Sequence, residues 1–313
     1  MAVYNVFSSC ICYNYKTYVC SKATVVLVIL SVMTVIFPLI FTYKSHGFWQ
    51  RTDTYQEQPK VNFLYDYVIF FDVLKSSGKR SDDGIFLCSN LERLTLMTRN
   101  HNHCPFIKAY EEDINADGFN DLLKFETKLF LPPGSHVNGL SIMLMFDYKL
   151  SSYCRAQLEG AAYVYHSSPV SGAGVSVIGD LSLVQRQPLN PRGLDLRYNK
   201  TVVPMDINDN VFLMSDILMA YAQRNLTTRL TNVYISWITK RVDAEPFTVD
   251  VTVMYPETTV RYTPTTWQVM RLAWTQFFPV LIVFVYLFKS IKEFIFSNQL
   301  VTTYREEPRV KGY

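Results

Sequence analysis

The chain has 313 residues, of which 49% are hydrophobic, 15% aromatic and 18% charged, with a formal net charge of +3. The charged fraction is below that of an average soluble domain, and the excess of apolar residues lies near the two ends of the chain. The small positive charge forms no basic stripe, so we expect no nucleic-acid partner.

The first apolar segment covers residues 23–43, between Lys22 and Lys44, and contains no charged residue. At about 1.5 Å per residue, a helix of this length crosses a hydrocarbon core of roughly 30 Å. A cleaved signal peptide has a shorter apolar stretch, of about 7–15 residues, that ends in a small-residue cleavage site. The sequence therefore predicts a retained transmembrane helix over 23–43, preceded by a cytosolic segment, 1–22.

The middle of the chain, 44–270, is expected to be mainly β. Strands are predicted where aromatic and β-branched residues gather or where apolar and polar residues alternate. These runs are 61–74, 123–131, 139–148, 157–165, 175–185, 233–239 and 247–254. Residues 75–110 show no regular pattern and are interpreted as a long loop. Residues 209–225 have apolar residues at helical spacing, with Asp209 or Asn210 as the N-cap. We expect a sandwich-like domain of about eight strands with one helix.

An acidic stretch, EEDINADGFND at 111–121, has the spacing of a calcium-binding loop. Its oxygen side chains are those of Asp113, Asn115, Asp117 and Asp121. A full EF-hand needs a glutamate where this chain has Lys124, so a switching EF-hand is not expected. Two interpretations stay open. The loop holds a structural calcium ion, or it is a bare turn in which Asp and Asn bond their own backbone and Gly118 takes a positive φ.

A second charge-free stretch, 272–288, predicts a second transmembrane helix over 271–289. Its flank carries Lys289 and Lys292, and the first span follows a segment with lysines and no acidic residue. Positive flanks stay in the cytosol. Both termini, including the tail 290–313, are therefore expected to be cytosolic, and the β domain lumenal or extracellular.

Several residues are candidates for covalent modification. Asn199 and Asn225 each begin an Asn-x-Thr sequon in the domain expected to be lumenal. Cys20 abuts the first span and is a candidate for palmitoylation, with free thiols at this end as the alternative. The expected lumenal domain has three cysteines, so at most one disulfide forms within it. They are Cys88, Cys104 and Cys154.

Motifs of catalysis are missing from the sequence. It has no Gly-x-Ser-x-Gly elbow, no phosphate-binding glycine loop and no His-Glu-x-x-His. His101, His103 and Cys104 lack a fourth metal ligand and are interpreted as a solvated loop. We therefore expect a protein that is not an enzyme, requires no cofactor and has no small-molecule substrate.

The segment that follows the second span mixes apolar and charged residues. Phe294, Ile295 and Phe296 stand beside Lys292 and Glu293. Such a segment lies on a membrane or docks to a partner. The alternative is a fraying helix end.

A series of stretches, in order along the chain, resembles the transmembrane protein 231 family. They are SHGFW (45–49), YQEQP (55–59), EEDINADGFND (111–121), GDLSLVQRQPL (179–189), GLDLRYN (193–199), AYAQRNLTT (220–228) and IKEFIFSNQLVTT (291–303). Residues 75–110 and those beyond Thr303 depart from the family pattern. The order and spacing of the stretches, more than any one of them, make the resemblance specific.

The resemblance implies a non-catalytic, two-span scaffold subunit of the tectonic-like complex in the ciliary transition-zone membrane. It further implies a role in the diffusion barrier between ciliary and plasma membranes, in cilium assembly and in Hedgehog signalling. The partners would be other transition-zone proteins and membrane lipid. A receptor, or an auxiliary subunit of a channel or transporter, would share the same topology and is the alternative.

Overall fold

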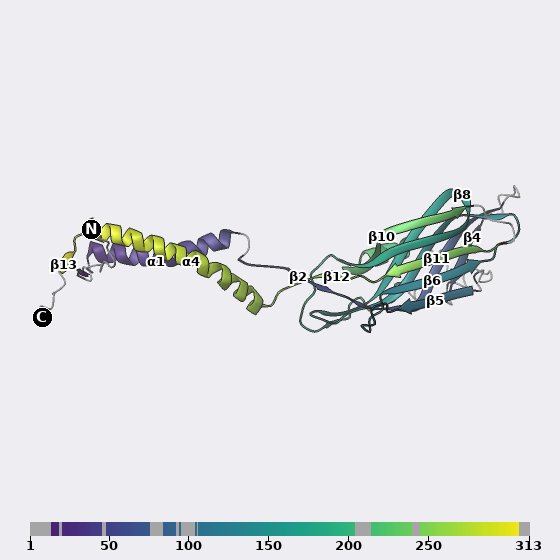
Figure 1. The fold of residues 1–313 in the computed structure, drawn as a ribbon, viewed down its shortest axis with the longest axis horizontal. Helices are drawn as coiled ribbons and strands as arrows, with labels where there is room; N and C mark the ends of the chain where they lie inside the picture. The colour runs from purple at the N-terminus through teal and green to yellow at the C-terminus, as the bar shows by residue number, and fades with distance from the viewer. Residues whose placement is uncertain are drawn as a thin grey trace, which may run out of the picture. The chain divides into compact units, whose positions relative to one another are not determined.

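The computed structural model describes residues 14–18, 21–45, 48–75, 84–91, 94, 104, 106–203, 214–239 and 245–306. They divide into two compact units. The β unit runs from Thr52 to Thr263, and the helical unit is built from the segments on either side of it. Figure 1 labels the elements of both units.

The helical unit contains two long helices and one short ribbon. Helix α1 is Lys22–Lys44 and helix α4 is Thr266–Ser297. The two helices lie side by side (Figure 1). Strand β1, Asn14–Lys16, pairs antiparallel with β13, Tyr304–Glu306. The segment before α1 is thus joined to the segment after α4.

The β unit contains eleven of the named strands and helix α3. They are β2 Asp53–Glu57, β3 Lys60–Lys75, β4 Gly84–Ser89, β5 Phe106–Glu112, β6 Leu122–Leu129, β7 Ser135–Leu150, β8 Arg155–Gln185, β9 Leu194–Asp195, α3 Met214–Ala222, β10 Leu226–Thr239, β11 Phe247–Met254 and β12 Thr258–Tyr262. Nine strands form one sheet in the order β4-β3-β7-β8-β11-β6-β5, with β10 and β9 also paired to β8. Strands β2 and β12 form a separate antiparallel ribbon.

The long strand β8 joins the two halves of this sheet. Its first part pairs with β7, from Ala156 to Gly172. Its second part runs between β10 and β11. A bulge with Pro169 separates the two parts, and proline is tolerated at a bulge because no ladder hydrogen bond is lost there. Gly172 follows, and a Cβ there would lie 2.5 Å from the ring of Trp237, so only glycine lets that ring cover the strand.

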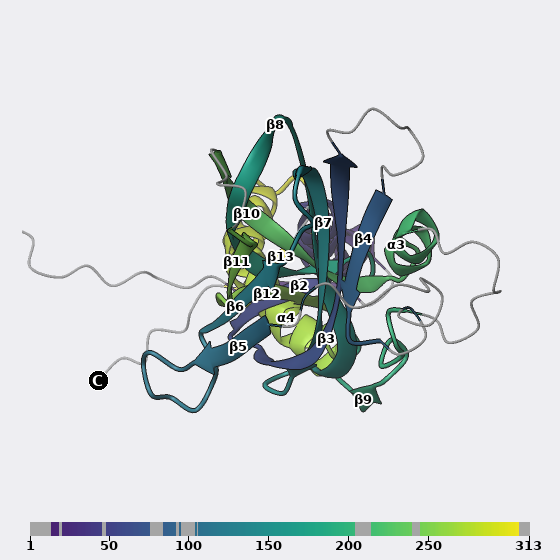
Figure 2. The ribbon, with the colours of Figure 1, turned by 90° about the vertical axis from the view of Figure 1, so that its right-hand side faces the viewer.

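The sheet curls so that its two halves face each other across an aromatic core. Phe125 on β6 contacts Phe63 and Tyr67 on β3, with ring centroids 6.1 and 5.6 Å apart. Phe71 on β3 contacts Phe247 on β11 at 5.9 Å. Edge-to-face and tilted contacts of this kind add to the free energy gained by burying the rings. Figure 2 shows the sheet from its end, with β5 and β6 on one side and β4 on the other.

The Glu111 carboxylate on β5 hydrogen-bonds to β3 at a point where β3 leaves its regular pairing with β7. Tyr65 has a φ of 63°, and the register shifts between Phe63 and Tyr67. The Phe63 N–H donates instead to Oε1 of Glu111 on β5, at 2.8 Å. Tyr255 Oη donates to the same oxygen at 3.0 Å. Burial raises the pKa of Glu111, although these two donors favour its charged form.

Most predicted strands are confirmed, but two interpretations were wrong. The runs 157–165 and 175–185 belong to the single strand β8, so the domain is one curled sheet and not a sandwich of separate sheets. The irregular region 75–110 contains β4 and the start of β5. The predicted helix is α3, and its predicted N-cap residues lie outside the described part of the chain.

Helix α3 covers the outer face of the β4-β3-β7-β8 half of the sheet (Figure 2). Its Ile217 and Tyr221 are buried against Val68, Met143 and Ala161. The Tyr221 hydroxyl accepts hydrogen bonds from Ala161 N (2.9 Å) and Thr228 N (2.8 Å) and donates to Thr228 O (3.2 Å). The Tyr221 hydroxyl therefore links α3 to both β8 and β10 by hydrogen bonds.

Tyr221→Phe should lower the free energy of unfolding by about 2–4 kcal/mol, because two buried N–H groups lose their acceptor. The measurement is denaturant unfolding of the purified full-length chain. Tyr234→Phe is the matched control, since Tyr234 is 71% exposed, and it should change the stability by less than about 0.5 kcal/mol. Equal effects of the two substitutions would contradict the fastening role of Tyr221.

Candidate functional site

Helix α1 has an apolar surface with almost no cover inside the fold. Ser21 caps its first turn by accepting from Thr24 N. Its hydroxyl side chains bond to its own backbone, as Ser31 does to Leu27 O at 2.8 Å. Among the residues that the structure describes, α1 is the one helix long and apolar enough to cross a membrane. The predicted span 23–43 falls inside it.

Helix α4 contains the second predicted span, 271–289, but is not among the candidate spans that length and composition single out in the described residues. The described residues thus show one candidate span, α1, and the second span over 271–289 stays a prediction. The charge-free part of α4 has 17 residues, which is the short end of the range for a membrane-spanning helix. The helix itself is well formed. Thr265 and Gln268 make a capping box at its start.

Aromatic and small residues join α1 to α4. Phe37 stacks on Phe284 with ring centroids 6.4 Å apart, and Phe41 contacts the same ring at 6.2 Å. Ala23 and Ala273 are buried, which lets backbones approach closely, as at the interfaces of membrane helices. Many other large side chains of the two helices are exposed, among them Phe278, Ile282 and Tyr286.

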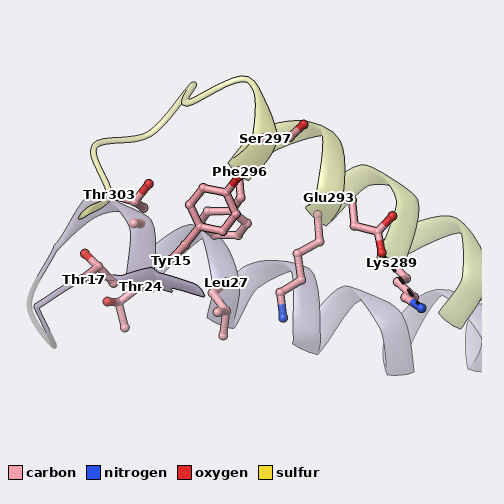
Figure 3. Close-up of a pocket in the computed structure, with 11 residues that line it drawn as sticks. Tyr15, Thr17, Thr24, Leu27, Lys289, Glu293, Phe296, Ser297 and Thr303 are labelled. Carbon is pink, nitrogen blue, oxygen red and sulfur yellow. Dashed lines mark ion pairs between the residues drawn. The ribbon is translucent and has the colours of Figure 1, made fainter. Parts of the chain in front are cut away.

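The predicted docking residues separate into two kinds. Phe294 is 62% exposed. Phe296 is half-buried, and its ring lies 6.3 Å from that of Tyr15 on β1 (Figure 3). Helix α4 continues through both residues and ends at Ser297. Phe296 therefore supports the unit internally, Ile295 is half-buried and Phe294 is exposed, and docking of a partner here stays a prediction.

The loop 113–121 is held by its own side chains. Asp121 Oδ2 accepts from Ile114 N at 2.8 Å, and Asp113 Oδ2 accepts from Gly118 N at 2.9 Å. Asp117 and Asn115 also accept from backbone N–H groups two residues further along. Gly118 has a φ of +88°, as an Asx-rich turn requires. Across the described part of the chain, no three His, Cys, Asp or Glu side chains are grouped as metal ligands. Calcium binding here stays a prediction.

The modification sites lie in different settings. Asn199 is exposed on a loop, and Asn225 is half-buried at the turn before β10. Cys20 and the pair His101 and His103 lie outside the described residues. Glycosylation and palmitoylation therefore stay predictions.

Two of the cysteines are paired. Cys88 on β4 and Cys104 form a disulfide, and Cys154 is a buried free thiol whose pKa is raised by burial. The sequence limited the domain to one disulfide, and the structure identifies its partners. Disulfides persist in secreted and lumenal domains and are rare in the cytosol.

The chain enters and leaves the β unit through a neck formed by β2 and β12. Asp53 pairs with Tyr262, whose Oη donates to Asp53 Oδ2 at 3.0 Å. Burial and this carboxylate raise the pKa of Tyr262 to about 12, so the phenol stays a donor at neutral pH. Glu57 Oε1 accepts from the N–H groups of Ser151 and Ser152. The neck is thereby bonded to the body of the domain.

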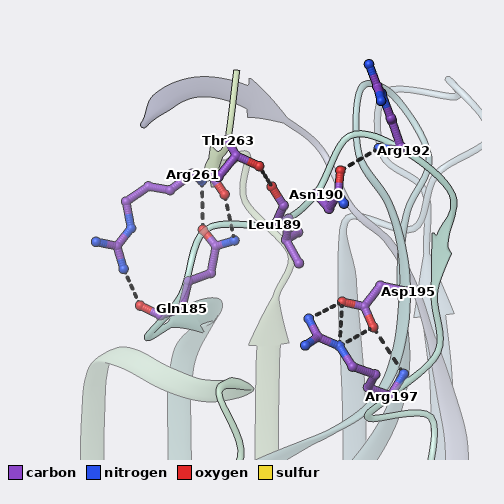
Figure 4. A network of polar contacts seen from close by, with 8 residues as sticks. All are labelled: Gln185, Leu189, Asn190, Arg192, Asp195, Arg197, Arg261 and Thr263. Carbon is purple, nitrogen blue, oxygen red and sulfur yellow. Dashed lines mark hydrogen bonds and ion pairs between the residues drawn. The ribbon is translucent and has the colours of Figure 1, made fainter. Parts of the chain in front are cut away.

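Strand β12 is also hydrogen-bonded to the end of β8 and to the segment that follows β8 (Figure 4). Gln185 and Arg261 exchange hydrogen bonds through the Gln185 amide group and the Arg261 backbone, at 2.8 and 3.2 Å. Leu189 N donates to Arg261 O, and Thr263 N donates to Leu189 O, both at 2.9 Å. The end of β8 and the segment after it therefore fix the direction in which the chain leaves the domain.

The sequence interpretation missed the neck and the β1–β13 ribbon. A signal for β12 is present in TTVRY, where buried Thr258, Val260 and Tyr262 alternate with exposed residues. Strand β13 has only three residues, which is too short for a periodic pattern.

Comparison with known proteins identifies the family. The family model described as Transmembrane protein 231 matches residues 1–305. The chain belongs to the transmembrane protein 231 family. The Xenopus tropicalis Transmembrane protein 231 is 36% identical over 305 residues, covering 97% of this chain and 96% of the relative. The Homo sapiens protein of the same name is 34% identical over 307 residues, covering 97% and 95%.

Members of the transmembrane protein 231 family are transmembrane proteins by name and do not form an enzyme family. Among solved structures, a proton-activated chloride channel determined by cryo-EM aligns over 88% of this chain and 99% of the channel chain. Its TM-score is 0.27 and its identity 8%, and this likeness supports no inference.

The disulfide gives a direct test. Replacing Cys88 and Cys104 together with serine should lower the free energy of unfolding by about 3 kcal/mol, because the bond closes a loop with a sequence separation of 16. Alkylation before and after reduction, followed by mass spectrometry, measures the bond in the full-length chain. Cys154→Ala should leave it intact. Full alkylation of Cys88 and Cys104 in the wild-type chain without reductant would show that the bond is absent.

Proposed function

We propose that this chain is a non-catalytic scaffold subunit of the ciliary transition-zone membrane complex. In this role α1 and α4 anchor it in the bilayer, and the β unit offers a rigid surface to other lumenal or extracellular domains. It contributes to the barrier between ciliary and plasma membranes, to cilium assembly and to Hedgehog signalling. The observation that supports the proposal most strongly is the family match over residues 1–305.

The exposed surface of α4 supports a second crossing of the membrane. Ile282, Val283 and Tyr286 are 67%, 64% and 76% exposed within the fold. Trp267, near the start of the helix, is 75% exposed and suits a membrane interface. Burying such side chains in lipid stabilises the helix pair by roughly 25 cal/mol per Å² of apolar area removed from water. We therefore place 271–289 in the bilayer beside 23–43.

The proposed orientation has both termini in the cytosol. Lysines flank the cytosolic ends of the two helices, in keeping with the positive-inside rule. The Cys88–Cys104 disulfide fits an oxidising compartment for the β unit. Glycans on Asn199 and Asn225 and a palmitoyl group on Cys20 would follow from the same orientation.

A structural calcium ion at 113–121 is a separate proposal for the same compartment. Millimolar calcium should then raise the melting temperature of the full-length chain, and Asp117→Ala should abolish the rise. Identical melting curves in calcium and in chelator would leave the loop as a turn held by its own hydrogen bonds.

Localisation tests the proposed function. A carboxyl-terminally tagged chain in ciliated cells should form a narrow band between markers of the basal body and the axoneme. Signal along the whole cilium or over the cell surface would contradict the scaffold role and favour a receptor or an auxiliary subunit.

We propose that exposed Phe294 contacts a cytosolic partner, and this contact can be tested in the same cells. Phe294→Asp should reduce co-purification of cytosolic transition-zone partners several-fold, because it places a charge on an exposed apolar docking residue. Phe130→Asp is the matched control, since Phe130 is 53% exposed and lies after β6 in the other unit. Unchanged co-purification with Phe294→Asp would remove this residue from the interface.

A further inference from the structure

A groove of about 730 Å³ opens in the helical unit, where α1 begins and α4 ends (Figure 3). Its apolar wall includes Ala23 and Leu27 from α1 and Phe296 from α4. Tyr15 lies beside Phe296 and completes the aromatic side. The groove therefore offers an apolar surface at the end of the helix pair that carries the lysines.

The α4 side of the groove also carries charged residues. Lys289, Lys292 and Glu293 line it in successive turns of α4. Lys289 Nζ lies 3.9 Å from Glu293 Oε1, so these two charges offset each other. Lys292 makes no ion pair with any residue that the structure describes. The groove has one uncompensated positive charge.

Two hydroxyl groups that line the groove donate to backbone oxygens, whereas Thr303 Oγ1 is buried with no hydrogen-bond partner among the described residues. Thr24 Oγ1 donates to Tyr18 O at 2.9 Å, and Ser297 Oγ donates to Phe294 O at 3.4 Å. The Lys292 ammonium is exposed and has no hydrogen-bond partner among the described residues. A ligand in this groove would therefore be recognised by charge at one end and by apolar contact at the other.

We propose that this groove binds one anionic phospholipid, with its phosphate at Lys292 and an acyl chain along Leu27. The inference rests on the proposed anchoring of α1 and α4 in the bilayer, and names a ligand for that anchor. A membrane lipid fits better than a soluble anion. The apolar wall continues into the exposed apolar surface of α1, where Val28 and Ile29 are 53% and 50% exposed. Basic pockets between membrane helices at the cytosolic surface bind anionic headgroups.

Native mass spectrometry of the full-length chain in micelles tests the proposal by titration with phosphatidylserine and with phosphatidylcholine. The wild-type chain should bind one phosphatidylserine at least about fivefold more tightly than phosphatidylcholine. Lys292→Gln should weaken phosphatidylserine binding about fivefold, the effect of removing one lysine near an anionic headgroup. Its binding of phosphatidylcholine should not change.

Lys22→Gln is the matched control, because Lys22 is exposed at the same end of the helix pair and does not line the groove. It should change phosphatidylserine binding by less than about twofold. An equal loss with Lys22→Gln would mean attraction by the general surface charge, and would overturn the site. Equal binding of the two lipids, or equally tight binding of soluble glycerophosphoserine, would also overturn the site. A dimer that Lys292→Gln dissociates would overturn it too, because the groove would then bind a second copy of the chain.

Membrane insertion of the same chain is measured in liposomes, by the access of a protease to each end of α4. If α4 does not cross the bilayer, the proposed anchor and the lipid site both fail. If both helices cross and phosphatidylserine is not preferred, the lipid site alone fails.

Discussion

The pairing of the two ends of the chain is the constraint on which the rest of the structure depends. In the β unit, Asp53 pairs with Tyr262, so the chain enters and leaves the domain on adjacent strands. In the helical unit, α1 packs against α4, and β1 pairs with β13. Each pairing joins residues more than 200 positions apart, which costs loop-closure entropy. Hydrogen bonds around β12 and stacked rings between the helices offset that cost.

This arrangement places apolar side chains in two different settings. In the β unit they face inward, where Phe125 and Phe247 are fully buried in the aromatic core. On the helix pair they face outward, and Ile282 and Val283 are mostly exposed. A surface of that kind is not stable in water, since contiguous exposed apolar patches mark membrane or protein contacts. The proposed scaffold role joins the two settings: a lipid-covered anchor and a domain whose sheet is closed by Glu111.

Much of the fold could be predicted from the sequence, because its signals are local. The aromatic run 61–74 and the alternating run 247–254 gave β3 and β11. The continuity of β8 could not be predicted, because the proline and glycine at its bulge are typical of a turn. Only the structure shows that the Trp237 ring lies on Gly172 and needs a glycine there. The neck also depends on partners far apart in sequence. At the predicted docking segment, spacing could not tell that Phe296 meets Tyr15 whereas Phe294 stays exposed.

The central claim is that both helices cross the membrane and hold the β unit on the far side. Protease protection in sealed microsomes, with a different tag at each end of the full-length chain, tests it most directly. The account predicts that protease removes both tags and leaves the β unit as a protected fragment carrying glycans at Asn199 and Asn225. A carboxyl-terminal tag that stays protected together with the β unit would mean that α1 alone crosses the membrane, and would contradict the account.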